Sequence, residues 1–217
     1  MKQSTALDIL KTGKNVFLTG SAGAGKTYTI NQYLHYLRAR EVAVAVTAST
    51  GIAATHMNGM TIHSWVGMGI LNELTAKDIA RIKKRTVVAE RIQRTQVLII
   101  DEISMVRADI IDFIDKILRV YSQNMREPFG GKQILLVGDV YQLEPVLKND
   151  EREIINRFYP TPYFFSARVF NEIELVSIEL TKVYRQTDKV FVNVLDHIRT
   201  NTAGAADLQL LNTRYNT

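Results

Sequence analysis

Gly20-Ser21-Ala22-Gly23-Ala24-Gly25-Lys26-Thr27 fits the pattern GxxxxGK[ST] at every position. The stretch follows an apolar run at residues 15–19 and opens a segment with apolar residues at helical spacing, which is the context of a phosphate-binding loop. Its glycines allow backbone N–H groups to face phosphate oxygens, and the start of the helix adds partial positive charge. Lys26 can then reach the β- and γ-phosphates, and the Thr27 hydroxyl can bind Mg²⁺. The sequence therefore predicts a site for a nucleoside triphosphate.

Further apolar runs surround this loop and alternate in type. Runs typical of strands lie at residues 42–47, 97–100, 134–137 and 173–180. Helical spacing is found near residues 5–10, from the loop to about residue 40, and near 109–121 and 190–199. Continuous apolar strands that alternate with helices are typical of parallel sheets buried on both faces. We therefore expect an α/β fold with a mainly parallel sheet and helices on both faces.

Length and composition exclude several classes of protein. The 217 residues, 46% of them hydrophobic, suffice for one core but not for two full α/β domains, so residues 1–217 are expected to form one domain. Without cysteine, the chain can form neither disulfides nor thiolate metal sites. No apolar run approaches the length of a membrane span, and the first residues do not form a signal peptide. We therefore expect a cytoplasmic protein, associated with the nucleoid if bacterial, with no membrane partner.

Positive charge is concentrated in one segment. The formal net charge of the chain is +5, and residues 77–94 hold seven cations and two anions, which is 7 − 2 = +5. This segment is either a solvated helix face, with Ile79, Ile82 and Ile92 as its buried stripe, or a surface that contacts a phosphate backbone. Charge alone does not decide between the two.

Two carboxylates follow the apolar run at residues 97–100. Asp101 would hold Mg²⁺ opposite Thr27, and Glu102 would orient and deprotonate the attacking water. Acidic residues also follow ordinary strands, but the phosphate-binding loop earlier in the chain favours the catalytic interpretation. A glutamate beside the metal ligand indicates hydrolysis of the nucleotide.

Several longer motifs carry a resemblance to a known family. They are FLTGSAGAGKT (17–27), VTASTGIAATHMNGMTIHSW (46–65), LIIDEISMV (98–106), PFGGKQILLVGDVYQLEPV (128–146) and LTKVYRQTD (180–188). With these motifs the chain resembles the petite-integration-frequency family of 5′-to-3′ DNA helicases, in superfamily 1B. The resemblance implies a RecA-like P-loop NTPase lobe with residues 67–95 as a small, basic, wedge-like insertion. It also favours DNA contact by the basic segment.

The resemblance assigns nucleotide roles to several residues. Gln142 would sense the γ-phosphate, and Arg185 would stabilise charge on the transferred phosphoryl group; from the residues alone, the first could be a turn residue and the second a surface cation. Gln3, ahead of the first strand, resembles the glutamine that reads adenine. Catalysis would then depend on Lys26, Glu102, Gln142 and Arg185. The residues expected to hold ATP, besides Gln3, are Gly20, Ser21, Ala22, Gly23, Ala24, Gly25, Lys26, Thr27 and Tyr28.

The resemblance also implies contacts with single-stranded DNA. The residues concerned are Thr47, Ser49, Thr50, Gly51, His63 and Trp65. Hydroxyl and N–H groups after the second strand would bind phosphates, although Ser49 or Thr50 would also cap a helix. His63 and Trp65 would contact bases and backbone, with stacking worth about 1–3 kcal/mol per base. From the residues alone, a single tryptophan is more often part of a core.

Two features depart from the family pattern. Val140 and Glu144 stand where the family usually has an aromatic residue and a proline, in the loop that carries Gln142. Nothing after Arg185 resembles the second RecA-like lobe of these helicases, so we expect either the first lobe alone or a naturally shorter relative. The expected cofactors are ATP and Mg²⁺. The expected partners are single-stranded DNA, forked duplex DNA and, if the gene continues, a second lobe in cis, and the expected state is a monomer.

Two functions of different classes stay open at this point. One is the motor lobe of an ATP-dependent 5′-to-3′ DNA helicase, which couples hydrolysis to translocation and unwinding in the complete enzyme. The other is a nucleotide-gated single-stranded DNA-binding or adaptor module without useful hydrolysis. The presence of Glu102, Gln142 and Arg185 together favours the motor, because a binding module does not need all three.

Overall fold

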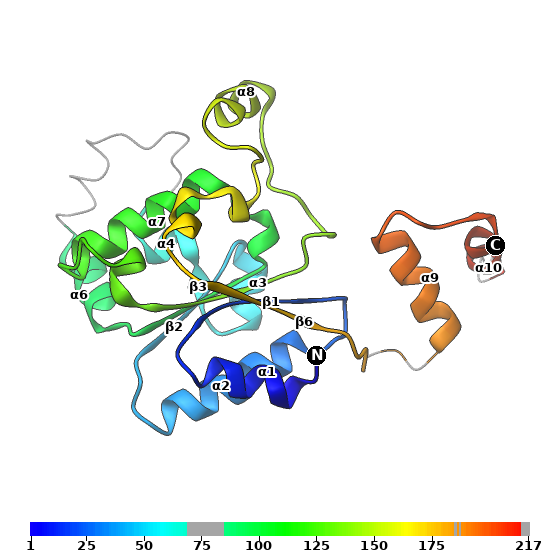
Figure 1. Cartoon of the computed structure of the whole chain (residues 1–217), viewed down its shortest axis with the longest axis horizontal. Helices are drawn as coiled ribbons and strands as arrows, with labels where there is room; N and C mark the ends of the chain where they lie inside the picture. Colours follow the sequence, from blue (N-terminus) through cyan, green and yellow to red (C-terminus); the bar gives the residue numbers. More distant parts are fainter. Residues whose placement is uncertain (69–84, 185, 187, 214–217) are drawn as a thin grey trace.

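A sheet of parallel strands organises the molecule (Figure 1). The computed structural model describes residues 1–68, 85–184, 186 and 188–213. The strands are β1 (Asn15–Gly20), β2 (Val44–Ala48), β3 (Met60–Thr61), β4 (Val97–Asp101), β5 (Gln133–Val137) and β6 (Leu175–Leu180). Their order is β3-β2-β4-β5-β1-β6, and every pairing is parallel. The expected α/β fold with a mainly parallel sheet is therefore confirmed.

Helices pack on both faces of this sheet (Figure 1). The α-helices are α1 (Gln3–Leu10), α2 (Lys26–Arg38), α3 (Gly51–His56), α4 (Ile62–Trp65), α6 (Thr86–Arg94), α7 (Ala108–Tyr121), α8 (Asn149–Phe158), α9 (Lys189–Arg199) and α10 (Ala205–Asn212). Short 3-10 helices are η1 (Ile103–Met105), η2 (Pro128–Gly131), η3 (Phe164–Ser166) and η4 (Arg168–Asn171). None of the helices in the described parts of the chain combines the length and apolar character that a membrane crossing needs.

The apolar run of β4 contributes to two cores. Val97 and Ile99 belong to the cluster that contains the buried residues of α1 and α2. Leu98 and Ile100 belong to the cluster that contains those of α6 and α7. Because successive side chains of a strand face opposite sides of the sheet, a strand covered on both faces is apolar at each position. This explains why the run is continuous and does not alternate with polar residues.

Most expected elements are present, with ends that differ by a few residues. The strands expected at 42–47 and 173–180 begin two residues later, in β2 and β6. The elements β3, α4, α8 and α10 were not expected. β3 and α4 have two and four residues, α8 buries one residue and α10 buries none, so each is short or buries few side chains.

The basic segment is described only in part. α6 buries Val88 and Ile92, which are 5% and 0% exposed, so this half of the segment is an amphipathic helix on the core. Ile92 therefore lies in a buried stripe as expected. Ile79, Ile82 and the cations from 77 to 84 lie outside the described residues. The wedge-like insertion at 67–95 stays a prediction.

The PFGG stretch forms a tight turn that a buried carboxylate holds. In η2, Phe129 and Gly130 have φ angles of 52° and 64°. The Asp115 carboxylate accepts a hydrogen bond of 2.6 Å from the Phe129 N–H. A Cβ on Gly130 would lie 2.7 Å from the Leu118 carbonyl oxygen. The turn therefore needs glycine at this position for space as well as for its backbone conformation.

Asp115→Ala is expected to lower the free energy of unfolding by about 2–4 kcal/mol, because it leaves the Phe129 N–H and the Nε of the half-buried Arg119 without their acceptor. Chemical denaturation followed by circular dichroism measures the loss. Glu172→Ala is the control: it removes the other carboxylate that Arg119 binds, which is 55% exposed, and should cost less than about 1 kcal/mol. Equal losses of stability in the two variants would contradict the conclusion that the buried Asp115 carboxylate stabilises this turn.

Candidate active site

The carboxyl ends of the parallel strands meet at one edge of the sheet. β1 ends at Gly20, where the phosphate-binding loop begins, and β4 ends at Asp101. Asp139 follows β5 by two residues. The charges of Asp139, Glu102 and Asp101 all act on the Lys26 ammonium group. The loop and three carboxylates therefore form one charged site at the edge where α/β proteins bind ligands.

Two glycines of the loop are required by their surroundings. Gly20 and Gly25 have φ angles of 146° and 88°. A Cβ on Gly20 would lie 2.5 Å from the Leu180 carbonyl oxygen, and a Cβ on Gly25 would collide with Nε2 of Gln3. Backbone conformation and lack of space thus act together at these positions.

Lys26 is held against the loop and is poorly hydrated. Its Nζ donates hydrogen bonds to the carbonyl oxygens of Gly20, at 2.7 Å, and Ser21, at 3.4 Å. Burial lowers the pKa of Lys26, and the nearby carboxylates oppose this shift. A buried ammonium group favours additional negative charge, which phosphate oxygens would supply.

The two acidic residues at the end of β4, Asp101 and Glu102, differ in geometry. Oδ1 of Asp101 accepts a hydrogen bond of 2.9 Å from the Glu102 N–H. Glu102 itself has a φ of 52°, in the left-handed region that non-glycine residues rarely adopt. Burial raises the pKa of Asp101. Burial, and then the charge of Asp101, raise the pKa of Glu102, which makes its carboxylate a better proton acceptor.

The donor groups at this edge suit Mg²⁺. Thr27 and Tyr28 are exposed in the first turn of α2, and Asp101 ends β4. Mg²⁺ usually takes one or two protein ligands and completes its shell with phosphate oxygens and water. Within the described residues, no group of three or more His, Cys, Asp or Glu side chains could hold a metal ion. Thr27 and Asp101 would therefore hold Mg²⁺ together with a nucleotide.

Two residues from distant parts of the chain brace the loop. Gln3 Nε2 donates to the Ala24 carbonyl oxygen at 3.3 Å, and the Tyr184 N–H donates to that of Gly23 at 2.9 Å. Gln3 thus lies beside the loop, and its contact with adenine stays a prediction. Tyr184 was not singled out from the sequence, because a backbone hydrogen bond leaves no pattern of residue types. Its neighbour Arg185, the expected phosphoryl-stabilising arginine, lies outside the described residues.

Gln142 lies in the loop after β5. It is exposed, and its Nε2 donates to Oδ2 of Asp139 at 3.3 Å. Val140 packs partly buried against the core, and Glu144 forms an ion pair of 3.7 Å with Arg152 of α8. The two departures from the family pattern therefore make contacts of their own.

A further cation at this edge was not expected from the sequence. Arg199, the last residue of α9, donates from Nε and Nη2 to the two carboxylate oxygens of Asp139, at 2.7 and 3.0 Å. The two residues are 60 positions apart. No local pattern signals such a pair.

Two of the residues expected to contact DNA are buried. Thr47 is 0% exposed, and its hydroxyl donates to the Ile99 carbonyl oxygen at 2.7 Å. Trp65 is 4% exposed and belongs to the core cluster with α7. This corrects the expectation for both: the Thr47 hydroxyl is satisfied within the sheet, and the Trp65 indole has no free face for a base.

The other expected DNA contacts lie closer to the surface. Thr50 caps α3 by accepting a hydrogen bond of 3.2 Å from the Ala53 N–H, and Gly51 is exposed. The buried Ser49 hydroxyl oxygen has no hydrogen-bond partner within the part of the chain that the structure describes. Burial, and then the charge of Arg107, lower the pKa of His63 and favour a neutral ring. DNA contact by Ser49, Thr50, Gly51 and His63 stays a prediction.

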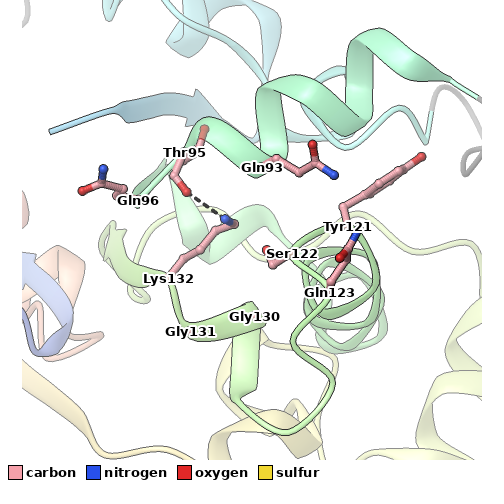
Figure 2. Close-up of a pocket in the computed structure, with 9 residues that line it drawn as sticks. All are labelled: Gln93, Thr95, Gln96, Tyr121, Ser122, Gln123, Gly130, Gly131 and Lys132. Carbon is pink, nitrogen blue, oxygen red and sulfur yellow. Dashed lines mark hydrogen bonds between the residues drawn. The ribbon is translucent and has the colours of Figure 1, made fainter.

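A separate hollow of about 710 Å³ lies at the opposite edge of the sheet (Figure 2). Its lining residues are Gln93, Thr95, Gln96, Tyr121, Ser122, Gln123, Gly130, Gly131 and Lys132. The buried Lys132 donates to the Thr95 carbonyl oxygen at 2.7 Å, just after α6 ends. Lysine commonly satisfies the last carbonyl groups of a helix, which explains its place in this hollow.

The fold and the charged edge define a RecA-like P-loop NTPase lobe. A family model described as PIF1-like helicase matches residues 2–203. The chain therefore belongs to the PIF1-like helicase family, which confirms the resemblance seen in the motifs.

Named relatives and solved structures agree with this assignment. The chain is 62% identical over 146 residues to the ATP-dependent DNA helicase Pif1 of Psychrobacter sp. (strain PRwf-1), covering 67% of this chain and 22% of that protein. A structure of two coordinating Pif1 helicases at forked dsDNA matches with a TM-score of 0.89 and 39% identity, over 97% of this chain and 50% of that one. The Bacteroides Pif1 helicase in complex with ADP-AlF3 and ssDNA matches with a TM-score of 0.81 and 37% identity, over 96% and 48%. The chain thus spans about a fifth of the Psychrobacter relative and about half of the helicase chains in these structures.

Proposed function

We propose that this chain is the first motor lobe of an ATP-dependent 5′-to-3′ DNA helicase. One observation carries the proposal: Lys26 of the phosphate-binding loop, Asp101 and Glu102 gather at one edge of the sheet in a member of the PIF1-like helicase family. The Psychrobacter relative bears the name ATP-dependent DNA helicase, and the Bacteroides relative binds ADP-AlF3 and ssDNA in its structure. These two relatives support ATP as the nucleotide and single-stranded DNA as the strand along which the helicase moves.

Each residue at the edge has a distinct task in hydrolysis. Lys26 exchanges its loop carbonyls for oxygens of the β- and γ-phosphates, which are better partners for an ammonium ion. Thr27 and Asp101 would hold Mg²⁺, which would supply charge stabilisation at the phosphates. Glu102 takes the proton of the attacking water, and Gln142 reports on the γ-phosphate from the loop after β5.

Unwinding requires more than this lobe. Translocation depends on two lobes whose gap closes and opens with ATP, so that two grips on DNA alternate. We therefore propose that a second RecA-like lobe completes the active site in the working enzyme and that forked duplex DNA is its substrate, as in the related structure with two Pif1 helicases. A monomeric state of this chain remains an expectation.

ATP hydrolysis by the chain, with and without a single-stranded oligonucleotide, tests the proposal. We expect slow turnover that exceeds a Lys26→Ala blank, rises with the oligonucleotide and is accompanied by no unwinding of a forked duplex. Turnover equal to the blank in both conditions, with nucleotide and DNA still bound, would contradict the motor assignment and support a nucleotide-gated binding module.

A further inference from the structure

The Asp139 carboxylate is the centre of a hydrogen-bond network that joins two distant parts of the chain. Its side chain is 0% exposed. Besides the two bonds from Arg199, it accepts one from Nε2 of Gln142 at 3.3 Å and one from the Tyr141 N–H at 3.2 Å. The loop after β5 and the end of α9 are therefore fixed to the same pair of oxygen atoms.

Within the described residues, Arg199 is the cation that pairs with the buried Asp139 carboxylate. A buried charge is stable only when it is paired and hydrogen-bonded, and the planar guanidinium meets both carboxylate oxygens at once. The guanidinium also lies over the Tyr141 ring, 4.7 Å from its centroid, and binds Asp196 of its own helix at 3.4 Å. Its side chain is 14% exposed, so these contacts occupy most of its surface.

The network lies next to the phosphate-binding loop. A cavity of about 830 Å³ separates α9 from the loop, and Ser21, Gln142 and Arg199 are among its lining residues. Asp139 is the carboxylate whose charge acts most strongly on Lys26, and Arg199 opposes it. The charges of Asp139 and Arg199 therefore both act on the lysine of the phosphate-binding loop, in opposite directions.

α9 has no part in either core. Its buried residue, Val194, belongs to neither cluster of the described residues. The contact between Arg199 and Asp139 is therefore not needed to assemble the sheet. A different role is needed to explain why Arg199 binds both oxygens of this buried carboxylate.

We propose that Arg199 is a positioning residue that acts through Asp139 to hold Gln142 at the γ-phosphate and links that loop to α9. This inference rests on the proposed function, because Gln142 needs a nucleotide to sense. In this inference Arg199 acts on the phosphate only through Asp139, because its Nε and Nη2 both donate to that carboxylate.

The test compares Arg199→Lys with Arg119→Lys in the full chain. Arg119 also contacts both carboxylate oxygens of an aspartate, Asp115, through its Nε at 2.9 Å, with 12% and 9% exposed side chains, at a different part of the fold. We expect Arg199→Lys to lower kcat for ATP about 10- to 100-fold and to change KM by no more than about twofold. Lysine keeps the positive charge but cannot donate to both oxygens of Asp139 in the planar geometry of arginine, so the loop that carries Gln142 would be displaced. Arg119→Lys should leave kcat unchanged at a temperature where it is folded. Equal kcat in Arg199→Lys and wild type would overturn the proposal.

A double-mutant cycle separates positioning from direct phosphate contact. If Arg199 acts through Asp139, Arg199→Lys causes no further loss of kcat in an Asp139→Asn background. A loss of the same size in both backgrounds would assign Arg199 to the phosphate and overturn the positioning role.

Hydrogen–deuterium exchange provides a readout that does not depend on turnover. Residues 139–142 should exchange at least about fivefold faster in Arg199→Lys than in wild type, and at the wild-type rate in Arg119→Lys. Unchanged exchange overturns the inference even if the wild-type chain hydrolyses ATP. Faster exchange in a chain without any turnover would support the inference and contradict the proposed function.

Discussion

Glu102→Gln is expected to lower ATP turnover about 10²- to 10⁴-fold while the nucleotide stays bound, because glutamine keeps the size of the side chain but cannot accept a proton from water. The structure supports this assignment through two features of Glu102: its carboxylate has a raised pKa next to Asp101, and its backbone adopts the left-handed region. Glutamine tolerates that backbone conformation about as well as glutamate, so the fold should be retained. Phosphate release in a single turnover measures the chemistry, and fluorescence of a labelled ATP measures binding.

Glu174→Gln is the matched control for this variant. Its carboxylate is 76% exposed and pairs with Lys14 away from the site, so neither turnover nor binding should change. If Glu102→Gln released phosphate at the wild-type rate, another group would have to be the base. If it lost nucleotide binding as well, Glu102 would help to hold the nucleotide, which contradicts a role confined to proton transfer.

Lys26→Ala is expected to weaken ATP binding about 10- to 160-fold, since each hydrogen bond to a charged group contributes about 1.5–3 kcal/mol. Turnover should fall to background, because the same ammonium group stabilises charge on the phosphates in the transition state. Isothermal titration calorimetry with ATP and Mg²⁺ gives the affinity.

Lys132→Ala provides a stringent comparison for Lys26→Ala. Lys132 is buried and, like Lys26, has a pKa lowered by burial and donates a 2.7 Å hydrogen bond to a backbone carbonyl, but it lies at the opposite edge of the sheet. We expect ATP affinity to be unchanged in Lys132→Ala even if its stability falls. Similar losses of affinity in the two variants would indicate that burial of a lysine, and not its place in the loop, determines the effect.

The sequence was sufficient to predict the parts of the site that are contiguous. The loop from 20 to 27 and the strand that ends at Asp101 carry their own hydrophobic and glycine patterns, and both elements lie where they were expected. Gln142 was identified from its motif, and Gln3 from its place before the first strand. These residues could be singled out because their neighbours in sequence define their context, and their roles at the nucleotide stay predictions.

Other residues could not be found or were misplaced for a common physical reason. Whether Trp65 and Thr47 are buried depends on packing and hydrogen bonds with segments distant in sequence. Local residue types do not specify these contacts. The pair of Arg199 with Asp139 spans 60 residues and has no pattern of its own. Elements such as β3 and α10 bury too few side chains to impose a period on the sequence.

The position of β1 and β4 inside the sheet has a mechanical consequence. Each of these strands has a parallel neighbour on both sides, whereas the two-residue β3 forms one rim. A force along the strands loads the hydrogen bonds on both sides of β1 and β4 in shear, so many bonds must break together. The rim has few bonds to resist the same pull. Under such a force, the lobe should therefore yield first at β3 and keep the strands before Lys26 and Glu102 aligned.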